Sequence, residues 1–316
     1  MMRIVFFGTP ASAVPFLDIL AAEKGRVAAV VTQPDRPAGR GLSSKPSPVK
    51  ARALELGLPV LDPEKPSLAA AEIKSLGADL AVVVAYGRIL KQDVLGAFRL
   101  GCLNVHFSLL PRLRGAAPVQ WALARGEAKT GVTLFWLDEG MDTGPIFSQK
   151  ETAIGPEENA AELLERLTNL GVGLVREALA DLERGAVRRE PQQGEASLAP
   201  LLRKEDGRFS FDEPARAVHG KVRGFCLWPR AFVVLRLPKG EMKLSVLSAE
   251  LEENSPKAGL PGTVARVGRD GSVLIQCRDA CLWLRTVCPE GKKPLAAAEF
   301  LNGLRLKAGD ALPFQA

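Results

Sequence analysis

The sequence predicts an α/β protein in two parts, a doubly wound and mostly parallel sheet followed by a smaller β-barrel. Strand-like and helix-like segments alternate up to about residue 183, which is typical of a parallel sheet with helices on both faces. Five short strand-like runs, separated by turn residues, then follow between residues 231 and 287. The length of 316 residues agrees with two domains.

In the first part, short apolar runs mark the strands, and alanine- or leucine-rich segments mark the helices. The run 79–86 is rich in valine and alanine, as expected for a strand buried on both faces. Residues 160–183 place Leu163, Leu167 and Leu174 on one helical face. The expected strands are 3–7, 27–32, 59–61, 79–86, 101–106 and 132–137, and the expected helices are a segment ending near 24, 49–56, 68–75 and 160–183.

A polar, proline-containing stretch over 186–207 predicts the boundary between the domains. We therefore expect a first domain over 1–186, a linker over 187–207 and a second domain over 208–316. The expected strands of the second domain are 231–237, 243–249, 262–267, 272–276 and 281–287, with a closing helix over 296–302. Five strands of this length suggest an OB-like barrel.

Composition argues against several classes of protein. The longest clean apolar stretches, such as 80–85, are far shorter than the ~20 residues that span a bilayer. No signal peptide is recognisable, so we expect a cytoplasmic protein with no membrane partner. Five cysteines without a CxxC pair predict reduced thiols, and two distant histidines argue against a metal site.

The positive charge of the chain lies in its last third. Residues 207–316 hold 17 Lys and Arg against 11 Asp and Glu, a net charge of +6, and residues 1–206 hold 25 of each. This distribution, with a pI near 9.1, indicates an acidic partner, of which nucleic acid is the commonest. The alternative is that the charge only keeps the protein soluble.

The phosphate-binding motifs of nucleotide enzymes are absent. The turn after the first strand is Gly8-Thr9-Pro10 rather than G-x-G-x-x-G, and no P-loop sequence occurs. The sheet therefore binds something other than a nucleoside triphosphate or a dinucleotide.

The densest polar cluster follows a buried strand. Asn104 and His106 are two residues apart and project to the same side of the strand, at the end where doubly wound sheets bind ligands. An Asn amide can stabilise an oxyanion, and a His can do the same or move a proton. Asp142, in a glycine-flanked loop, is a candidate to orient the imidazole or to accept a proton. The alternative is a core histidine and a turn-capping aspartate.

These residues resemble the active-site pattern of the formyltransferases that use 10-formyltetrahydrofolate. The pattern is Asn104-x-His106-x-Ser108-Leu109-Leu110-Pro111, followed by Asp142-Thr143-Gly144. Further segments extend the resemblance over nearly the whole chain to the methionyl-tRNA formyltransferase family; they are 7–10, 32–41, 46–50, 84–90 and 113–118. One departure is Phe107, where the family usually has a small residue, which suggests a changed pocket.

The resemblance implies a Rossmann-like formyltransferase domain and a C-terminal domain that binds tRNA. It also implies transfer of a formyl group from 10-formyltetrahydrofolate to the α-amine of methionine on initiator tRNA, in translation initiation, without a metal. Asn104 and His106 would stabilise the formyl oxygen, and Asp142 would orient His106 or assist proton removal. The folate-binding residues would be Tyr86, Gly87, Ile89, Leu90, Ser108, Leu109, Leu110 and Pro111.

The long connection Thr32–Lys50 corresponds to the tRNA-reading insertion of that family. Its cations, Arg36, Arg40, Lys45 and Lys50, are spaced by Pro and Gly, as expected for an exposed loop that meets phosphates. We expect a monomer. The alternatives are a formyltransferase for a small amine, such as a glycinamide ribonucleotide or an amino sugar, and a non-catalytic tRNA- or folate-binding protein.

Overall fold

A computed structural model describes residues 1–38, 43–238, 240–252 and 259–314. The chain forms two compact units. The first contains residues 1–118, 129–153 and 164–200, and the second contains residues 119–128, 154–163 and 201–316. The predicted domain limits stay a prediction, and the structure adds two short segments of the first half to the C-terminal unit.

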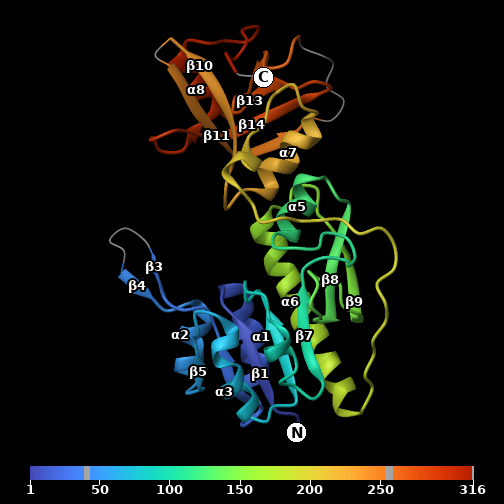
Figure 1. Cartoon of the computed structure of the whole chain (residues 1–316). Coiled ribbons are helices and arrows are strands. Elements are labelled where there is room, and N and C mark those ends of the chain that lie inside the picture. The colour runs from blue at the N-terminus through green and yellow to red at the C-terminus, as the bar shows by residue number, and fades with distance from the viewer. Residues whose placement is uncertain (39–42, 239, 253–258, 315–316) are drawn as a thin grey trace. The chain divides into compact units, whose positions relative to one another are not determined.

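The first unit is built on a seven-stranded sheet (Figure 1). The first four pairings along this sheet are parallel and the last two are antiparallel, so a single strand runs against the others, which confirms the mostly parallel sheet. In spatial order the strands are β5 (Val60–Leu61), β2 (Val27–Val31), β1 (Ile4–Gly8), β6 (Leu80–Val84), β7 (Gly101–His106), β8 (Lys129–Trp136) and β9 (Ile146–Ala153).

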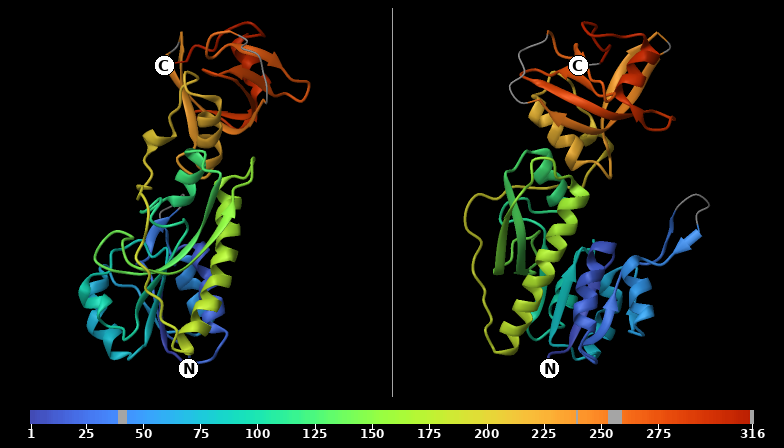
Figure 2. Two further views of the ribbon diagram at one scale, coloured as in Figure 1. Left: turned by 90° about the vertical axis from the view of Figure 1, so that its right-hand side faces the viewer. Right: turned by 180° about the vertical axis from the view of Figure 1, so that it is seen from behind.

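Helices cover both faces of this sheet (Figure 2). On one face Phe16 of α1 packs against Phe107 and against Gly171 of α6. On the other face Ile73 and Val94, from α3 and α4, share an apolar cluster with β1 and β6. The helices of this unit are α1 (Val14–Ala21), α2 (Pro48–Glu55), α3 (Ala70–Ser75), α4 (Gln92–Leu95) and most of α6 (Ala160–Glu183), with short 3-10 turns at Ala11–Ala13 and Pro66–Ala69. The helix α5 (Pro118–Ala124) belongs almost entirely to the second unit.

The chain reverses its winding direction at β1, which lies between β2 and β6. Successive strands run outward from β1 to β2 and β5 and then cross to β6 and β7 on the other side. The carboxyl ends of β1 and β6 therefore flank the position where a doubly wound sheet binds its ligand. Thr9 and Tyr86, just beyond these two ends, are joined by a 3.1 Å hydrogen bond from Thr9 Oγ1 to Tyr86 O.

Several elements were not expected from the sequence. The connection 32–50 contains a two-stranded hairpin of β3 (Arg36–Ala38) and β4 (Ser43–Lys45). The segments β9 and α5 in the first half, and α7 (Ala215–Gly224) in the second, were also missed. In contrast, the bounds predicted for α6, β7 and β10 (Ala231–Leu237) agree with the structure.

The second unit contains an antiparallel sheet in the order β10, β11 (Gly240–Leu251), β14 (Cys281–Pro289), β13 (Val273–Gln276) and β12 (Val264–Val267). The C-terminal tail hydrogen-bonds to both edge strands, through Asp310 O to Val264 N and Pro313 O to Arg236 N. These bonds satisfy edge groups that would otherwise face solvent, and they close the sheet in the manner of a small barrel. The unit is completed by β15 (Leu295–Ala296), α8 (Ala297–Leu304), α7 and a 3-10 turn at Lys204–Gly207.

All five cysteines are free thiols, and burial raises the pKa of Cys102 and Cys277 to about 12. Within the described ranges, no helix combines the length and apolar character needed to cross a bilayer.

Candidate active site

Strand β7 carries the two side chains at the centre of the site. Successive residues of a strand face opposite sides of the sheet, so Asn104 and His106 share one side, and Val105 and Phe107 share the other. The ring of Phe107 lies 6.4 Å from that of Phe16. Phe107 therefore fills the core under α1 and faces away from the candidate site, so it is not a wall of the pocket.

His106 is buried, and its two ring nitrogens have different partners. Nε2 lies 2.9 Å from the carbonyl oxygen of Leu113, which can only accept a hydrogen bond, so Nε2 carries the proton. Burial lowers the pKa of His106, and the nearby charge of Asp142 opposes that shift. The neutral ring therefore presents the lone pair of Nδ1, which lies 3.7 Å from Asp142 Oδ2.

Asp142 is brought to His106 by the conformation of its loop. Because β8 is antiparallel to β7, with Trp136 opposite Leu103, strand pairing alone does not place residue 142 beside residue 106. The loop is fixed by a 2.6 Å hydrogen bond from Gly115 N to Asp142 Oδ2 and by Gln192 Nε2, which donates to Asp142 O at 2.8 Å. Asp142 has a φ of 54°, a left-handed conformation that Asp tolerates better than most residues.

The side-chain amide of Asn104 is half-buried, and it has no hydrogen-bond partner among the residues that the structure describes. Amides at such positions normally find a protein partner or water. Its N–H groups are thus available to an oxygen of a bound molecule on the side of β7 that His106 shares.

Ser108–Pro111 form a tight turn directly after β7. The Ser108 side chain is fully buried and its hydroxyl donates to Arg112 O at 2.6 Å, so it shapes the turn. Thr133 on β8 accepts from Leu110 N and donates to Ser108 O, and Gln149 on β9 donates to Leu110 O. The antiparallel strands at this edge therefore hold the turn in place.

The loop after β6 is attached to the neighbouring strand ends through its backbone. Tyr86 O accepts hydrogen bonds from Thr9 Oγ1 and, at 2.8 Å, from Gln33 Nε2. The Tyr86 ring points into the apolar cluster beside Phe7, and its hydroxyl has no hydrogen-bond partner within the described part of the chain. Burial raises the pKa of this hydroxyl. Leu90 is buried and Ile89 is 82% exposed, so Ile89 is the apolar side chain of this loop that a ligand could cover.

Backbone strain is concentrated around these groups. Ala85, Leu113 and Asp142 have positive φ values of 45°, 59° and 54° without being glycine. Each left-handed residue costs roughly 1 kcal/mol or more, and such residues cluster where function requires a fixed geometry. Leu113 supplies the carbonyl that orients His106, and Ala85 leads into the Tyr86 loop.

Comparison with known proteins identifies the family. The Formyl transferase family matches residues 2–179, and its C-terminal domain family matches residues 201–305. The methionyl-tRNA formyltransferase of Sorangium cellulosum (strain So ce56) is 48% identical over 316 residues, covering 98% of this chain and 99% of that protein. The chain belongs to the methionyl-tRNA formyltransferase family. It is therefore a formyl transferase enzyme.

Solved structures with the same fold include two that were determined with folates. WlaRD, a sugar 3N-formyl transferase studied in the presence of dTDP and 5-N-formyl-THF, has a TM-score of 0.68 at 16% identity, covering 93% of this chain and 99% of that one. HypX from Aquifex aeolicus in complex with tetrahydrofolic acid has a TM-score of 0.65 at 22% identity, covering 100% of this chain and 50% of that one. At these identities the likeness shows the fold alone.

Three of the four predicted tRNA-binding cations of this formyl transferase are among the described residues, and they lie on or beside the hairpin β3–β4. The backbone of Arg36 begins β3 and pairs with that of Lys45, whose side chain is exposed. Arg40 lies outside the described residues. Lys50 differs from Lys45, because its ammonium group lies between the carboxylates of Asp35 and Asp62.

Sequence reasoning missed the groups whose hydrogen bonds fix His106, Asp142 and the turn that follows β7. They are Leu113 O, Gly115 N, Thr133, Gln149, Gln192 and Ser197, whose hydroxyl accepts from Leu113 N at 2.9 Å. Gln192 and Ser197 belong to the stretch interpreted as a linker, and residues up to Pro200 pack with the first unit. A polar stretch with no hydrophobic period gives no signal for such contacts.

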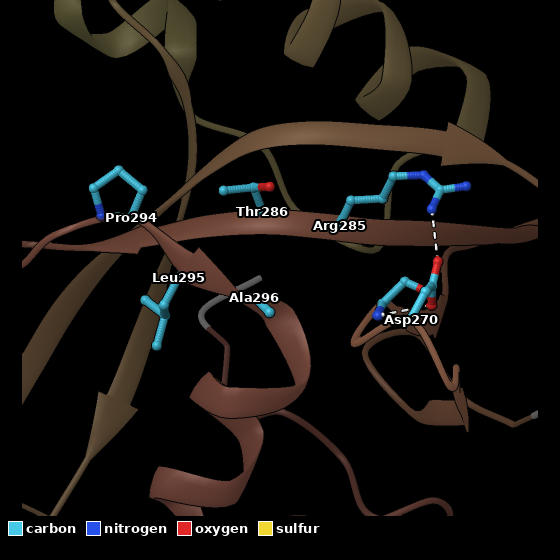
Figure 3. A pocket seen from close by; sticks show the side chains of 7 residues that line it. Asp270, Arg285, Thr286, Pro294, Leu295 and Ala296 are labelled. Carbon is cyan, nitrogen blue, oxygen red and sulfur yellow. Dashed lines mark hydrogen bonds and ion pairs between the residues drawn. The ribbon is translucent and has the colours of Figure 1, made fainter.

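A shallow hollow in the second unit, lined in part by Asp270, Arg285 and Thr286, is shown in Figure 3. Arg285 is the cation of this hollow, and it forms ion pairs with both Asp270 and Glu250. With its charge compensated in this way, Arg285 does not offer an unpaired cation to an anion in this hollow.

Proposed function

We propose that this enzyme transfers a formyl group from 10-formyltetrahydrofolate to the α-amine of methionine on initiator methionyl-tRNA. The observation that carries the proposal is the Asn104 amide of β7, which has no partner among the described residues and lies on the side of the strand that bears His106, whose ring faces Asp142 of the loop after β8. The sequence identity of 48% with a full-length methionyl-tRNA formyltransferase supports the substrates. The proposal places the protein in the cytoplasm, acting as a monomer.

In the first step, the lone pair of the methionine nitrogen attacks the formyl carbon. The α-amine has an ordinary pKa of about 7.7–8.0, so a substantial fraction is neutral near pH 7.5. The new C–N bond forms while the carbonyl π electrons move to the formyl oxygen. The Asn104 amide donates to that oxygen, and a single donor of this kind is typically worth about 100- to 1,000-fold in turnover.

The attacking nitrogen becomes positively charged and must lose a proton. Nδ1 of His106 is an acceptor because Nε2–H is engaged by Leu113 O. Protonation makes the ring an imidazolium, whose charge is stabilised by Asp142 at 3.7 Å and is attracted to the oxyanion. The sequence-based expectation left two roles open for His106, stabilising the formyl oxygen or moving a proton; the hydrogen bond from Nε2 to Leu113 O supports the second.

In the second step, the tetrahedral intermediate collapses. The oxyanion electrons reform the carbonyl, the bond between the formyl carbon and N10 of the folate breaks, and N10 receives the proton that His106 holds. The products are formylmethionyl-tRNA and tetrahydrofolate, and His106 returns to its neutral form. No net proton is taken up or released.

The donor site is proposed between the Tyr86 loop and the turn Ser108–Pro111. The exposed Ile89 side chain supports this, because a bound ring system would remove it from water. Gly87 has a φ of 76° and leaves backbone without a side chain beside Tyr86 O. Ser108, Leu110 and Pro111 would act through the shape of their turn, since their side chains are buried.

The positive charge of the protein supports tRNA as the acceptor. The net charge of +6 within residues 207–316 and the exposed Lys45 favour contact with phosphates. Arg36 and Arg40, which the sequence analysis also predicted, are proposed to contribute further phosphate contacts.

Formyl transfer from labelled 10-formyltetrahydrofolate to initiator methionyl-tRNA tests the proposal, with elongator methionyl-tRNA as control. We expect strong transfer to the initiator tRNA only, and a loss of turnover of at least about 100-fold in Asn104→Ala. Transfer to a small amine but to neither tRNA would refute initiator methionyl-tRNA as the formyl acceptor. Near-normal turnover by Asn104→Ala would refute the site.

A further inference from the structure

Lys50 holds together three segments at the base of the β3–β4 hairpin. It lies in the first turn of α2, and its Nζ is 2.8 Å from Asp35 Oδ2 and 2.7 Å from Asp62 Oδ2. The Lys50 side chain is only 19% exposed. The hydrogen bonds to the two carboxylates raise the pKa of Lys50, so its amine stays protonated near neutral pH.

The positions of these partners in the chain make the contact a clamp. Asp35 directly precedes β3, and Lys50 follows the end of β4 by five residues, so the pair joins the two ends of the insertion. Asp62 follows β5 and is therefore anchored to the sheet. A second bond between the same two ends, from Thr32 to Ser47, joins their hydroxyls at 2.7 Å.

The clamped segment is also connected to the proposed folate loop. Gln33, two residues before Asp35, donates to Tyr86 O at 2.8 Å. Val49 N, beside Lys50, donates to Thr9 O at 3.3 Å, and Thr9 in turn donates to Tyr86 O. A displacement of the hairpin base would therefore act directly on the loop that follows β6.

The charge around Lys50 does not suit a phosphate. One ammonium group faces two carboxylates, so the local net charge is negative, and a phosphate would meet like charge before it reached Nζ. Lys45, on the same hairpin, is exposed and has no ion-pair partner among the described residues. The two lysines differ in environment although both were predicted from the sequence as phosphate contacts.

We propose that Lys50 is a positioning residue, which with Asp35 and Asp62 fixes the base of the β3–β4 hairpin so that the hairpin meets the tRNA in a set orientation relative to the folate loop. The inference rests on the proposed function for its tRNA partner. The clamp itself is a property of the free protein and can be measured without tRNA.

The first experiment is hydrogen exchange of the backbone amides in 33–38 and 43–50 in the free protein. Lys50→Met keeps much of the aliphatic stem but leaves two facing carboxylates, and we expect exchange there to become at least about tenfold faster. Lys50→Arg should restore protection in large part, and Lys45→Ala should leave it unchanged. Unchanged protection in Lys50→Met would overturn the clamp.

The second experiment measures kcat/KM for initiator methionyl-tRNA as a function of salt. For a phosphate contact, removal reduces the slope of log(kcat/KM) against log[salt] by about one, which we expect for Lys45→Ala. For Lys50→Met we expect a roughly tenfold lower kcat/KM, mostly in KM, with the slope unchanged. A slope reduced by about one in Lys50→Met would make Lys50 a phosphate ligand and overturn the proposal.

The two experiments separate the clamp from the function. If the unaltered protein formylates no tRNA, the proposed function fails, and hydrogen exchange still decides whether Lys50 fixes the hairpin base. If tRNA is formylated and the exchange rates do not respond to Lys50→Met, the function stands and the clamp fails.

Discussion

Replacing Asp142 by Asn removes one negative charge and retains an oxygen that can accept the hydrogen bond from Gly115 N. In the proposed mechanism this charge stabilises the imidazolium that forms when His106 accepts the amine proton. The expected consequence is a loss of turnover with little change in the fold or in tRNA affinity.

The magnitude follows from the 3.7 Å separation of Asp142 Oδ2 and His106 Nδ1. Two unit charges at this distance attract by about 2 to 4.5 kcal/mol for an effective dielectric constant of about 40 to 20. If the full charge develops in the transition state, turnover falls by about 40- to 2,000-fold. Single-turnover transfer from labelled 10-formyltetrahydrofolate to bound initiator methionyl-tRNA measures this step without product release.

Nitrogen NMR of His106 gives a readout that does not depend on activity. At pH 7 the ring should be the neutral Nε2–H tautomer, because burial lowers its pKa from the ordinary value of 6.5. Asp142 raises this pKa, so Asp142→Asn should lower it further. Asp138→Asn is the matched control in the same loop, because Asp138 contacts Thr143 and Gly140 instead.

Turnover within about threefold of normal in Asp142→Asn would refute the reasoning, since no charge at Asp142 would then be felt in the transition state. A ring protonated at pH 7, or an Nδ1–H tautomer, would refute the assignment of Nδ1 as the proton acceptor.

Two further substitutions test how the site is supported. Tyr86→Phe removes a buried hydroxyl that has no hydrogen-bond partner among the described residues, so we expect the free energy of unfolding to rise by about 1 kcal/mol and turnover to stay near normal. Urea unfolding measures the change in stability, and a fall in stability would contradict a buried hydroxyl without a partner. Gly115→Ala adds a Cβ at 2.7 Å from Ala199 O at a residue with a φ of 117°, so we expect at least about 2 kcal/mol of destabilisation. Because Gly115 N donates to Asp142 Oδ2, the shift of the backbone should also displace Asp142 and lower turnover. Gly57→Ala, at a φ of 65° with no atom within 4 Å of the new Cβ, is the control for backbone strain alone, and equal losses in the two variants would contradict the steric argument.

Most of the first sheet could be predicted because its signals are local. The buried strand 80–84 is a run of Leu, Ala and Val, and the period of leucines in 160–183 marks α6 with its observed bounds. The missed strand β9, IFSQKETA, lies at the sheet edge, is mostly polar and has a single buried residue, so it shows little hydrophobic pattern. The missed helix α7 contains two glycines, which lower its intrinsic helix propensity.

The sequence by itself determined the family, the fold class and the strand that carries Asn104 and His106, because these depend on residue types and on spacings within one segment. Only the tertiary structure decided which ring nitrogen of His106 is free, since that depends on Leu113 O. It also decided that Asp142 reaches His106, through contacts with Gly115 and Gln192, which are 27 and 50 residues away along the chain. Only the tertiary structure shows that Phe107 lies beside Phe16 and that Lys50 contacts Asp35 and Asp62, which led to the proposed positioning role of Lys50. The role of a side chain is set by the groups within a few ångströms of it, and sequence spacing does not fix those groups when they come from different elements.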